Sequence, residues 1–160
     1  MRYSLSTTAR VLLMITATTI SAACNDNATA PDPSGPVSIA ISQSLTGQTT
    51  SAGAFIMTGA RADSGSTTEE LTFGGPLTQS PVPLTYVRTL TGKQGTLTVR
   101  GSATLTFTSQ TAATLTGSWT VEKGTGVYVN TTGTGTITGA ANFGATPPTG
   151  TLVYAGRLER

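Results

Sequence analysis

The sequence predicts an all-β protein, folded as a single antiparallel up-and-down β-barrel of about eight strands. Three observations carry this prediction. Apolar residues alternate with threonine through most of the chain after residue 36, and threonine supplies 35 of the 160 residues. Glycine- and proline-rich turn signals separate these runs at intervals of about ten residues. No segment of this part shows the 3.6-residue periodicity of a helix.

Each expected strand has one apolar and one polar face. Val37, Ile39 and Ile41 fall on one side of the first run. Threonine suits the other side because its β-branched side chain favours extended backbone and its hydroxyl stays hydrated. The predicted strands are 37–45, 52–60, 67–73, 83–91, 95–101, 103–109, 113–122, 133–142 and 150–158. Thr-Leu-Thr recurs at irregular intervals, which favours independent strands over a solenoid repeat. We expect residues 37–160 to form one barrel domain.

The N-terminal segment has the features of an export signal. Arg2 and Arg10 precede an apolar stretch, which is followed by small residues at 21–23. Cys24 comes next, and this arrangement resembles the lipobox of bacterial lipoproteins, although Ser21 stands where leucine is usual. We predict a signal peptide over 1–23, lipidation at Cys24, and a proline-rich tether over 24–36. The protein would then be exported and lipid-anchored on the periplasmic or cell-surface side of a bacterial membrane. Cleavage nearby, leaving a free cysteine, is the alternative.

Composition excludes several chemistries. The chain has no histidine and one cysteine, so histidine-based catalytic triads and internal disulfides are excluded. The formal charge of +2 arises from Arg2 and Arg10, because the rest of the chain has seven basic and seven acidic residues and a net charge of 7 − 7 = 0. We therefore expect no nucleic-acid binding.

We also expect no metal and no cofactor. The only acidic cluster, Asp63, Glu69 and Glu70, has oxygen ligands that suit calcium. We interpret it instead as a solvated hairpin loop. If this segment is a strand, Glu69 and Glu70 point to opposite faces.

One segment is distinctive. Residues 117–136 read GSWTVEKGTGVYVNTTGTGT, a tryptophan-bearing strand, a Gly-Thr-Gly-x-Tyr turn and a Gly-x-Gly segment. This resembles the allene oxide cyclase and dirigent-like β-barrels over about residues 50–160, with further hairpins expected around 58–65 and 90–97. The resemblance implies an eight-stranded barrel with an apolar interior, and it assigns no catalytic residue.

The residues of this segment have simple physical interpretations. We expect Trp119 in the core, and Tyr128 with a buried ring and a hydrated hydroxyl. Gly124, Gly126, Gly133 and Gly135 are expected to permit turns or bulges.

Candidate ligand-binding residues are Tyr86, Arg88, Glu122 and Tyr128. Tyr86 and Arg88 share one face of a predicted strand. An interior face would place these polar groups in a cavity suited to a carboxylate-bearing or phenolic molecule. An exterior face would make them solubilising side chains, and this is what we expect.

Three functions follow from these features. The leading hypothesis is a membrane-anchored lipoprotein whose barrel is a binding or structural module, with an apolar small molecule as its possible partner. The second is a cyclase- or isomerase-like enzyme that uses tyrosine, arginine and carboxylates on an apolar substrate. The third is an adhesion module that uses the threonine-rich surface.

Overall fold

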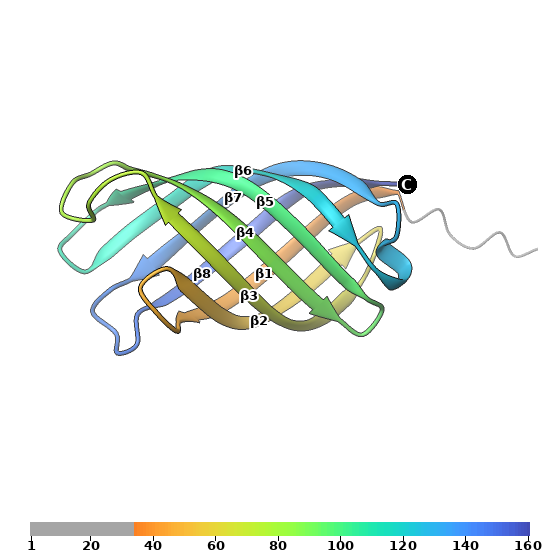
Figure 1. Cartoon of the computed structure of the whole chain (residues 1–160), viewed down its shortest axis with the longest axis horizontal. Coiled ribbons are helices and arrows are strands. Elements are labelled where there is room, and N and C mark those ends of the chain that lie inside the picture. Colours follow the sequence, from red (N-terminus) through yellow and green to blue (C-terminus); the bar gives the residue numbers. More distant parts are fainter. Residues whose placement is uncertain (1–33) are drawn as a thin grey trace, which may run out of the picture. The chain divides into compact units, whose positions relative to one another are not determined.

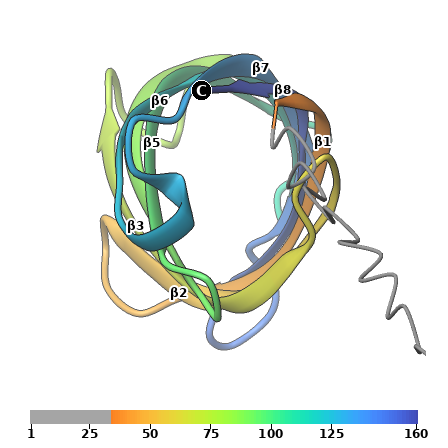
Figure 2. The same cartoon turned by 90° about the vertical axis from the view of Figure 1, so that its right-hand side faces the viewer.

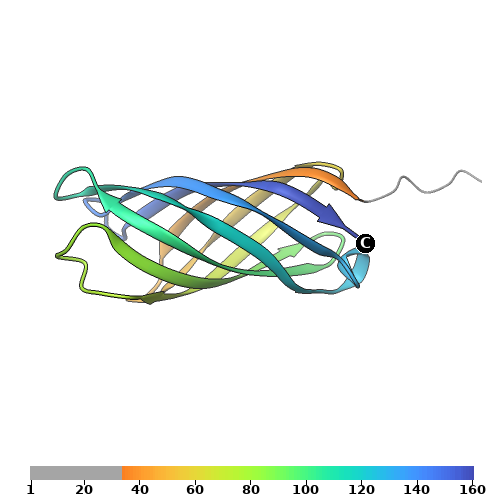
Figure 3. The ribbon, with the colours of Figure 1, turned by 90° about the horizontal axis from the view of Figure 1, so that it is seen from above.

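The computed structural model describes residues 34–160, which form a closed antiparallel barrel with the strands in sequence order (Figures 1 and 3). The strands are β1 (Gly35–Leu45), β2 (Thr50–Gly59), β3 (Asp63–Phe73), β4 (Val82–Gly92), β5 (Thr96–Phe107), β6 (Ala112–Gly124), β7 (Thr132–Asn142) and β8 (Thr149–Glu159). A 3₁₀ turn, η1 (Gly126–Tyr128), joins β6 to β7. β8 pairs with β1 and closes the barrel. The predicted fold class is confirmed.

The alternation of the sequence determines the two surfaces of the barrel. In β4, Leu84 and Tyr86 point inward and are buried, whereas Thr85 between them is exposed. The same pattern repeats around the barrel, so that the outer surface is rich in threonine and serine. Across residues 34–160, no helix has the length and apolar character needed to cross a membrane.

β5 is one continuous strand where the sequence predicted two, 95–101 and 103–109. The sequence indicated a break near Gly101, but this glycine lies within the strand and is needed for packing. A Cβ atom there would lie 2.6 Å from the Tyr86 hydroxyl oxygen, so the glycine makes room for an inward-pointing tyrosine on β4. Joining these two segments reduces the nine predicted runs to eight strands.

The turn expected between the predicted strands 52–60 and 67–73 is shorter than predicted, because Asp63, Ser64 and Gly65 already belong to β3. The connection from β2 uses residues 60–62 instead. Asp63 Oδ1 accepts hydrogen bonds from the backbone N–H groups of Ser64 and Lys93, at 2.8 and 3.0 Å. The aspartate therefore fixes the β4–β5 turn rather than forming a turn of its own.

The middle of the barrel is filled by aromatic side chains. Trp119 is 1% exposed, which confirms its predicted core position. It packs against two glycines, since a Cβ atom at Gly135 or at Gly156 would lie 2.6 Å from its indole ring. Gly135 thus makes room for Trp119 within β7 instead of bending the strand. The ring of Tyr154 lies beside the indole, with centroids 6.3 Å apart.

The two ends of the barrel differ. The start of β1, the end of β8 and the three connections 60–62, 93–95 and 125–131 lie at one end, which we call the base. The connections 46–49, 74–81, 108–111 and 143–148 lie at the opposite end, which we call the mouth. Figure 2 looks onto the base, where η1 lies inside the outline of the strands. Tyr128 of η1 is buried, so this turn fills part of the base.

Candidate functional site

A polar network lies inside the barrel around Arg88 of β4, whose side chain is fully buried. Its guanidinium donates hydrogen bonds to Tyr154 Oη at 2.9 Å, Thr67 Oγ1 at 3.1 Å and Gln43 Oε1 at 2.6 Å. It also forms an ion pair with Glu69, with Nη2 2.6 Å from Oε1. We call this group the central network; its members are Gln43, Ser51, Thr67, Glu69, Arg88 and Tyr154.

The carboxylate of Glu69 is held from two sides. While Oε1 faces Arg88, Oε2 accepts hydrogen bonds from Gln43 Nε2 at 3.1 Å and Ser51 Oγ at 3.0 Å. Burial by itself lowers the pKa of Arg88, but attraction to Tyr154 and Glu69 outweighs burial and raises the pKa above its ordinary value. The arginine therefore stays charged, and the network contains one cation and one anion.

Two tyrosines complete the arrangement. Burial raises the pKa of Tyr154 to about 12, against the opposing attraction of the Arg88 cation. Burial and the neighbouring Tyr154 raise the pKa of Tyr86 as well, and the Tyr86 hydroxyl donates to the Ser118 carbonyl oxygen at 3.1 Å. Both phenols remain protonated at neutral pH, so they act as hydrogen-bonding groups and not as bases.

An apolar cavity of about 70 Å³ lies between this network and the mouth. Gln43, Glu69 and Tyr86 are among the polar residues that line it. Its apolar walls include Leu45, Leu71, Phe73, Leu84, Leu105, Leu115, Ile137, Ala141, Phe143 and Leu152. Several of these wall residues, such as Leu71 and Phe143, have only partly buried side chains. The volume suits a few water molecules or the end of a slender apolar chain.

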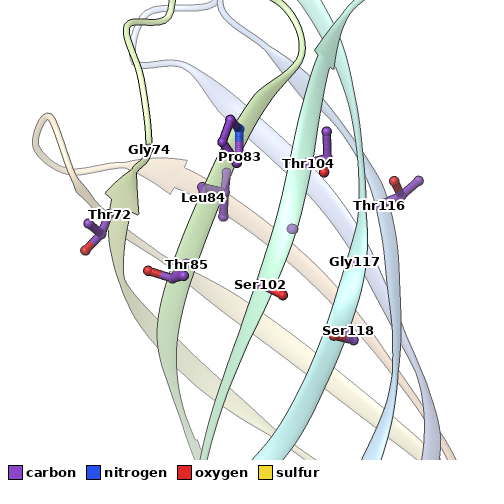
Figure 4. A pocket seen from close by; sticks show the side chains of 11 residues that line it. Thr72, Gly74, Pro83, Leu84, Thr85, Ser102, Thr104, Thr116, Gly117 and Ser118 are labelled. Atoms are coloured by element: carbon purple, nitrogen blue, oxygen red, sulfur yellow. The ribbon is translucent and has the colours of Figure 1, made fainter.

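A second depression lies on the outer surface over β3 to β6. Figure 4 shows its hydroxyl groups on neighbouring strands, namely those of Thr72, Thr85, Ser102, Thr104, Thr116 and Ser118. This depression has no charged side chain and is open to solvent, so it offers less enclosure to a ligand than the cavity inside the barrel.

The base contains a separate polar cluster. The Tyr128 hydroxyl donates to Asp63 Oδ2 at 2.8 Å, and the Arg61 guanidinium carbon lies 5.4 Å from the centre of the Tyr128 ring. Arg61 also donates to the carbonyl oxygen of Val127. The hydrogen bond from Tyr128 helps to lower the pKa of Asp63 although burial opposes it. These contacts fix η1 against the strands, and the expected hydrated hydroxyl of Tyr128 is instead bonded to a carboxylate.

The candidate ligand-binding residues fall in three different places. Tyr86 and Arg88 share a face as predicted, but this face is interior, which corrects the expectation of an exterior position. Glu122 is exposed on the outside. The β5–β6 register passes from Val99↔Val121 to Thr98↔Lys123 and leaves Glu122 unpaired at a bulge. Tyr128 belongs to the base cluster, away from Arg88.

The acidic cluster is not a solvated hairpin loop. Asp63 and Glu69 are buried at different levels of β3, whereas Glu70 is exposed on the opposite face. Glu69 and Glu70 thus point to opposite faces, as a strand requires. In residues 34–160, no group of three or more acidic or cysteine side chains is arranged to hold a metal ion.

Sequence reasoning missed Gln43, Glu69 and Tyr154 as partners of Arg88. For Glu69 a signal was present, since β3 and β4 are neighbouring strands and opposite charges often occupy paired positions. Glu69 is the direct register partner of Arg88. Gln43 and Tyr154 come from strands more distant in the sequence, and no local pattern marks them.

The predicted signal peptide 1–23, the lipidation site Cys24 and residues 25–33 of the predicted tether lie outside the described residues. Comparison with protein-family models, curated proteins and solved structures gave no match. The structure establishes the eight-stranded antiparallel barrel, but no comparison assigns the chain to a family. The resemblance to allene oxide cyclase-like and dirigent-like barrels stays a prediction.

Proposed function

We propose that this chain is a bacterial lipoprotein, anchored through Cys24, whose barrel binds an apolar small molecule in the cavity at its mouth. The cavity is the observation that carries the proposal: its walls are apolar, and it ends at buried polar groups that include Glu69 and Tyr86. Apolar walls with a few fixed polar groups are typical of small-molecule sites.

The two halves of the barrel interior support a binding role over a purely structural one. Towards the base, large side chains such as Ile39, Met57 and Leu97 are almost fully buried. Towards the mouth, Leu45, Phe73 and Leu115 remain partly exposed around the cavity. Leaving apolar side chains uncovered sacrifices burial free energy of about 25 cal/mol per Å², and an apolar ligand would recover it.

We favour binding over isomerase-like catalysis because the polar groups at the cavity floor are already engaged. Arg88 and Glu69 bond to each other and to neighbouring side chains. Tyr86 and Tyr154 have raised pKa values and keep their protons at neutral pH. These groups orient a ligand more readily than they transfer a proton to it.

Ligand binding is tested by extracting the purified mature domain with organic solvent and identifying small molecules by mass spectrometry. The proposal predicts an apolar molecule that is enriched in the wild-type extract. The matched control is an Ala141→Phe variant, which places a larger side chain in the cavity wall and should lose that molecule. Equal recovery from both proteins would place the molecule outside the cavity.

The membrane anchor needs a separate experiment. Cells that express the full chain are grown with a labelled fatty acid, alongside a Cys24→Ala control. The proposal predicts label on the wild-type protein and none on the variant. Equal labelling of the two proteins, or no labelling of either, would contradict lipidation at Cys24.

A further inference from the structure

The charges at the floor of the cavity cancel. Arg88 and Glu69 are the charged members of the central network, and they lie 2.6 Å apart. The Arg88 side chain has no exposure and that of Glu69 is 4% exposed. Both charges are thus removed from water and satisfied by each other, which leaves the floor neutral as a whole.

Most bonding positions of the two charges are occupied within the network. The guanidinium has five N–H groups, and it faces four acceptors, on Tyr154, Thr67, Gln43 and Glu69. Both carboxylate oxygens of Glu69 are likewise engaged, one by Arg88 and the other by Gln43 and Ser51. A charged ligand would gain at most one further hydrogen bond from either charged group unless it broke this network.

The order of the groups along the barrel also disfavours an anion. Glu69 and Gln43 line the cavity, whereas Arg88 does not. A carboxylate that entered from the mouth would therefore meet the Glu69 carboxylate before the guanidinium. A charged group moved from water into such an apolar site, without a free partner of opposite charge, loses hydration without compensation.

We propose that the barrel selects an uncharged ligand, a slender apolar molecule whose polar end is a neutral group such as an alcohol, ester or ketone. This inference rests on the proposed binding function and specifies its ligand class. The amide of Gln43 suits such a group: Nε2 has two N–H donors, it donates to Glu69, and the residue is only half-buried beside the cavity. The Glu69–Arg88 pair then disfavours charged ligands of either sign, and we call this effect the charge filter.

The first test compares three probes that share one apolar chain: hexan-1-ol, hexanoate and hexylammonium. Their binding to wild-type protein at pH 7 is followed by NMR shifts of the Leu105, Ile137 and Leu152 methyl groups. We expect hexan-1-ol to bind at least about tenfold more tightly than either ion, because the ions lose hydration in the cavity. Equal or tighter binding of hexanoate or hexylammonium would overturn the charge filter alone. Absence of binding by all three probes would overturn the binding function and the charge filter with it.

The second test changes the charges. Glu69→Gln leaves the guanidinium without its carboxylate and should bring hexanoate to at least the affinity of hexan-1-ol. Arg88→Gln should do the same for hexylammonium, and the double variant should again prefer hexan-1-ol. Glu159→Gln, which breaks the exposed pair with Arg157, is the matched control and should leave the preference unchanged.

These variants also control for folding. The double variant leaves neither Arg88 nor Glu69 as an unpaired buried charge, so it tests whether a neutral cavity floor prefers hexan-1-ol even if a single variant unfolds. A folded Glu69→Gln protein that still rejects hexanoate would overturn the proposal, as would a double variant that prefers either ion.

Discussion

Glu69 and Arg88 occupy directly paired positions on β3 and β4, and their side chains form an ion pair inside the barrel. On the base side of the pair, side chains such as Met57 and Leu97 are almost fully buried, whereas on the mouth side Leu45 and Phe73 remain partly exposed. The pair therefore separates a tightly packed half of the barrel from a half that opens to solvent. This position makes it important to the stability of the fold and to the chemistry of the cavity.

Removing one partner of this pair should destabilise the protein strongly. We expect Arg88→Gln to lower the free energy of unfolding by about 3–5 kcal/mol, because Glu69 is left as an uncompensated buried charge. The double variant Arg88→Gln/Glu69→Gln should lose less free energy of unfolding than the sum of the losses in the two single variants. Urea unfolding of the four proteins measures this coupling.

The exposed pair of Arg157 and Glu159, with N and O atoms 3.1 Å apart, provides the control for this double-mutant cycle. Since both side chains are about 60% exposed, the same substitutions there should change stability by less than about 1 kcal/mol. Additive effects at Arg88 and Glu69 would show that the buried pair is not coupled.

Asp63 should make the protein sensitive to acid. Its pKa is lowered from 3.8 in the folded state, because hydrogen bonds from Tyr128, Ser64, Lys93 and Gln94 outweigh the effect of burial. A lowered pKa means that the carboxylate stabilises the fold above pH 3.8 and that this contribution is lost as the pH falls through the folded-state pKa.

The measurement for Asp63 is the free energy of unfolding as a function of pH, for wild type and Asp63→Asn. The variant should be less stable by about 1–3 kcal/mol at pH 7, because the amide replaces one acceptor oxygen with a donor. Below pH 4 the difference should shrink. A constant difference between the two proteins from pH 7 to pH 3 would refute the role of the Asp63 charge.

Gly135 should tolerate no side chain. A Cβ atom there would lie 2.1 Å from the Ala155 carbonyl oxygen and 2.6 Å from the Trp119 ring. We expect Gly135→Ala to destabilise the protein by about 1–3 kcal/mol through overpacking. Tryptophan fluorescence during unfolding reports both the loss of stability and any shift of the Trp119 ring.

Gly75→Ala is the matched control, because its added Cβ atom would meet only Gln79 Oε1, at 4.0 Å. This variant should remain within about 0.5 kcal/mol of wild type, as is usual for surface changes. Comparable losses at Gly75 and Gly135 would contradict the role of the contact with Trp119, because a Gly→Ala change by itself lowers the entropy of the unfolded chain and stabilises the protein.

The fold could be predicted because alternation is a local property of the sequence. Threonine on one face and apolar residues on the other define each strand, and short turns leave an up-and-down arrangement as the simplest closure. Glycine was the main source of error. Gly101 and Gly135 resemble turn residues in the sequence, yet each makes room for an aromatic side chain on a neighbouring strand.

The candidate site was harder to predict because its contacts depend on register between strands. A lone arginine on a strand is usually exterior, and only the pairing with Glu69 makes its burial favourable. The partner of Tyr128 is Asp63, 65 positions away in the chain. Composition and periodicity contain no information on such distant pairs, whereas the closed barrel determines them.

Filling the cavity tests the central claim most directly. Ala141 lines the cavity, whereas Ala155 is exposed on the outside of β8, so Ala141→Phe and Ala155→Phe add the same side chain in different places. Hexan-1-ol is titrated into both variants and wild type, with binding followed by NMR. We predict that Ala141→Phe weakens binding by at least about tenfold, because the phenyl ring occupies the space of the ligand, and that Ala155→Phe binds like wild type. Unchanged binding by a folded Ala141→Phe variant would contradict the claim that the mouth cavity is the ligand site.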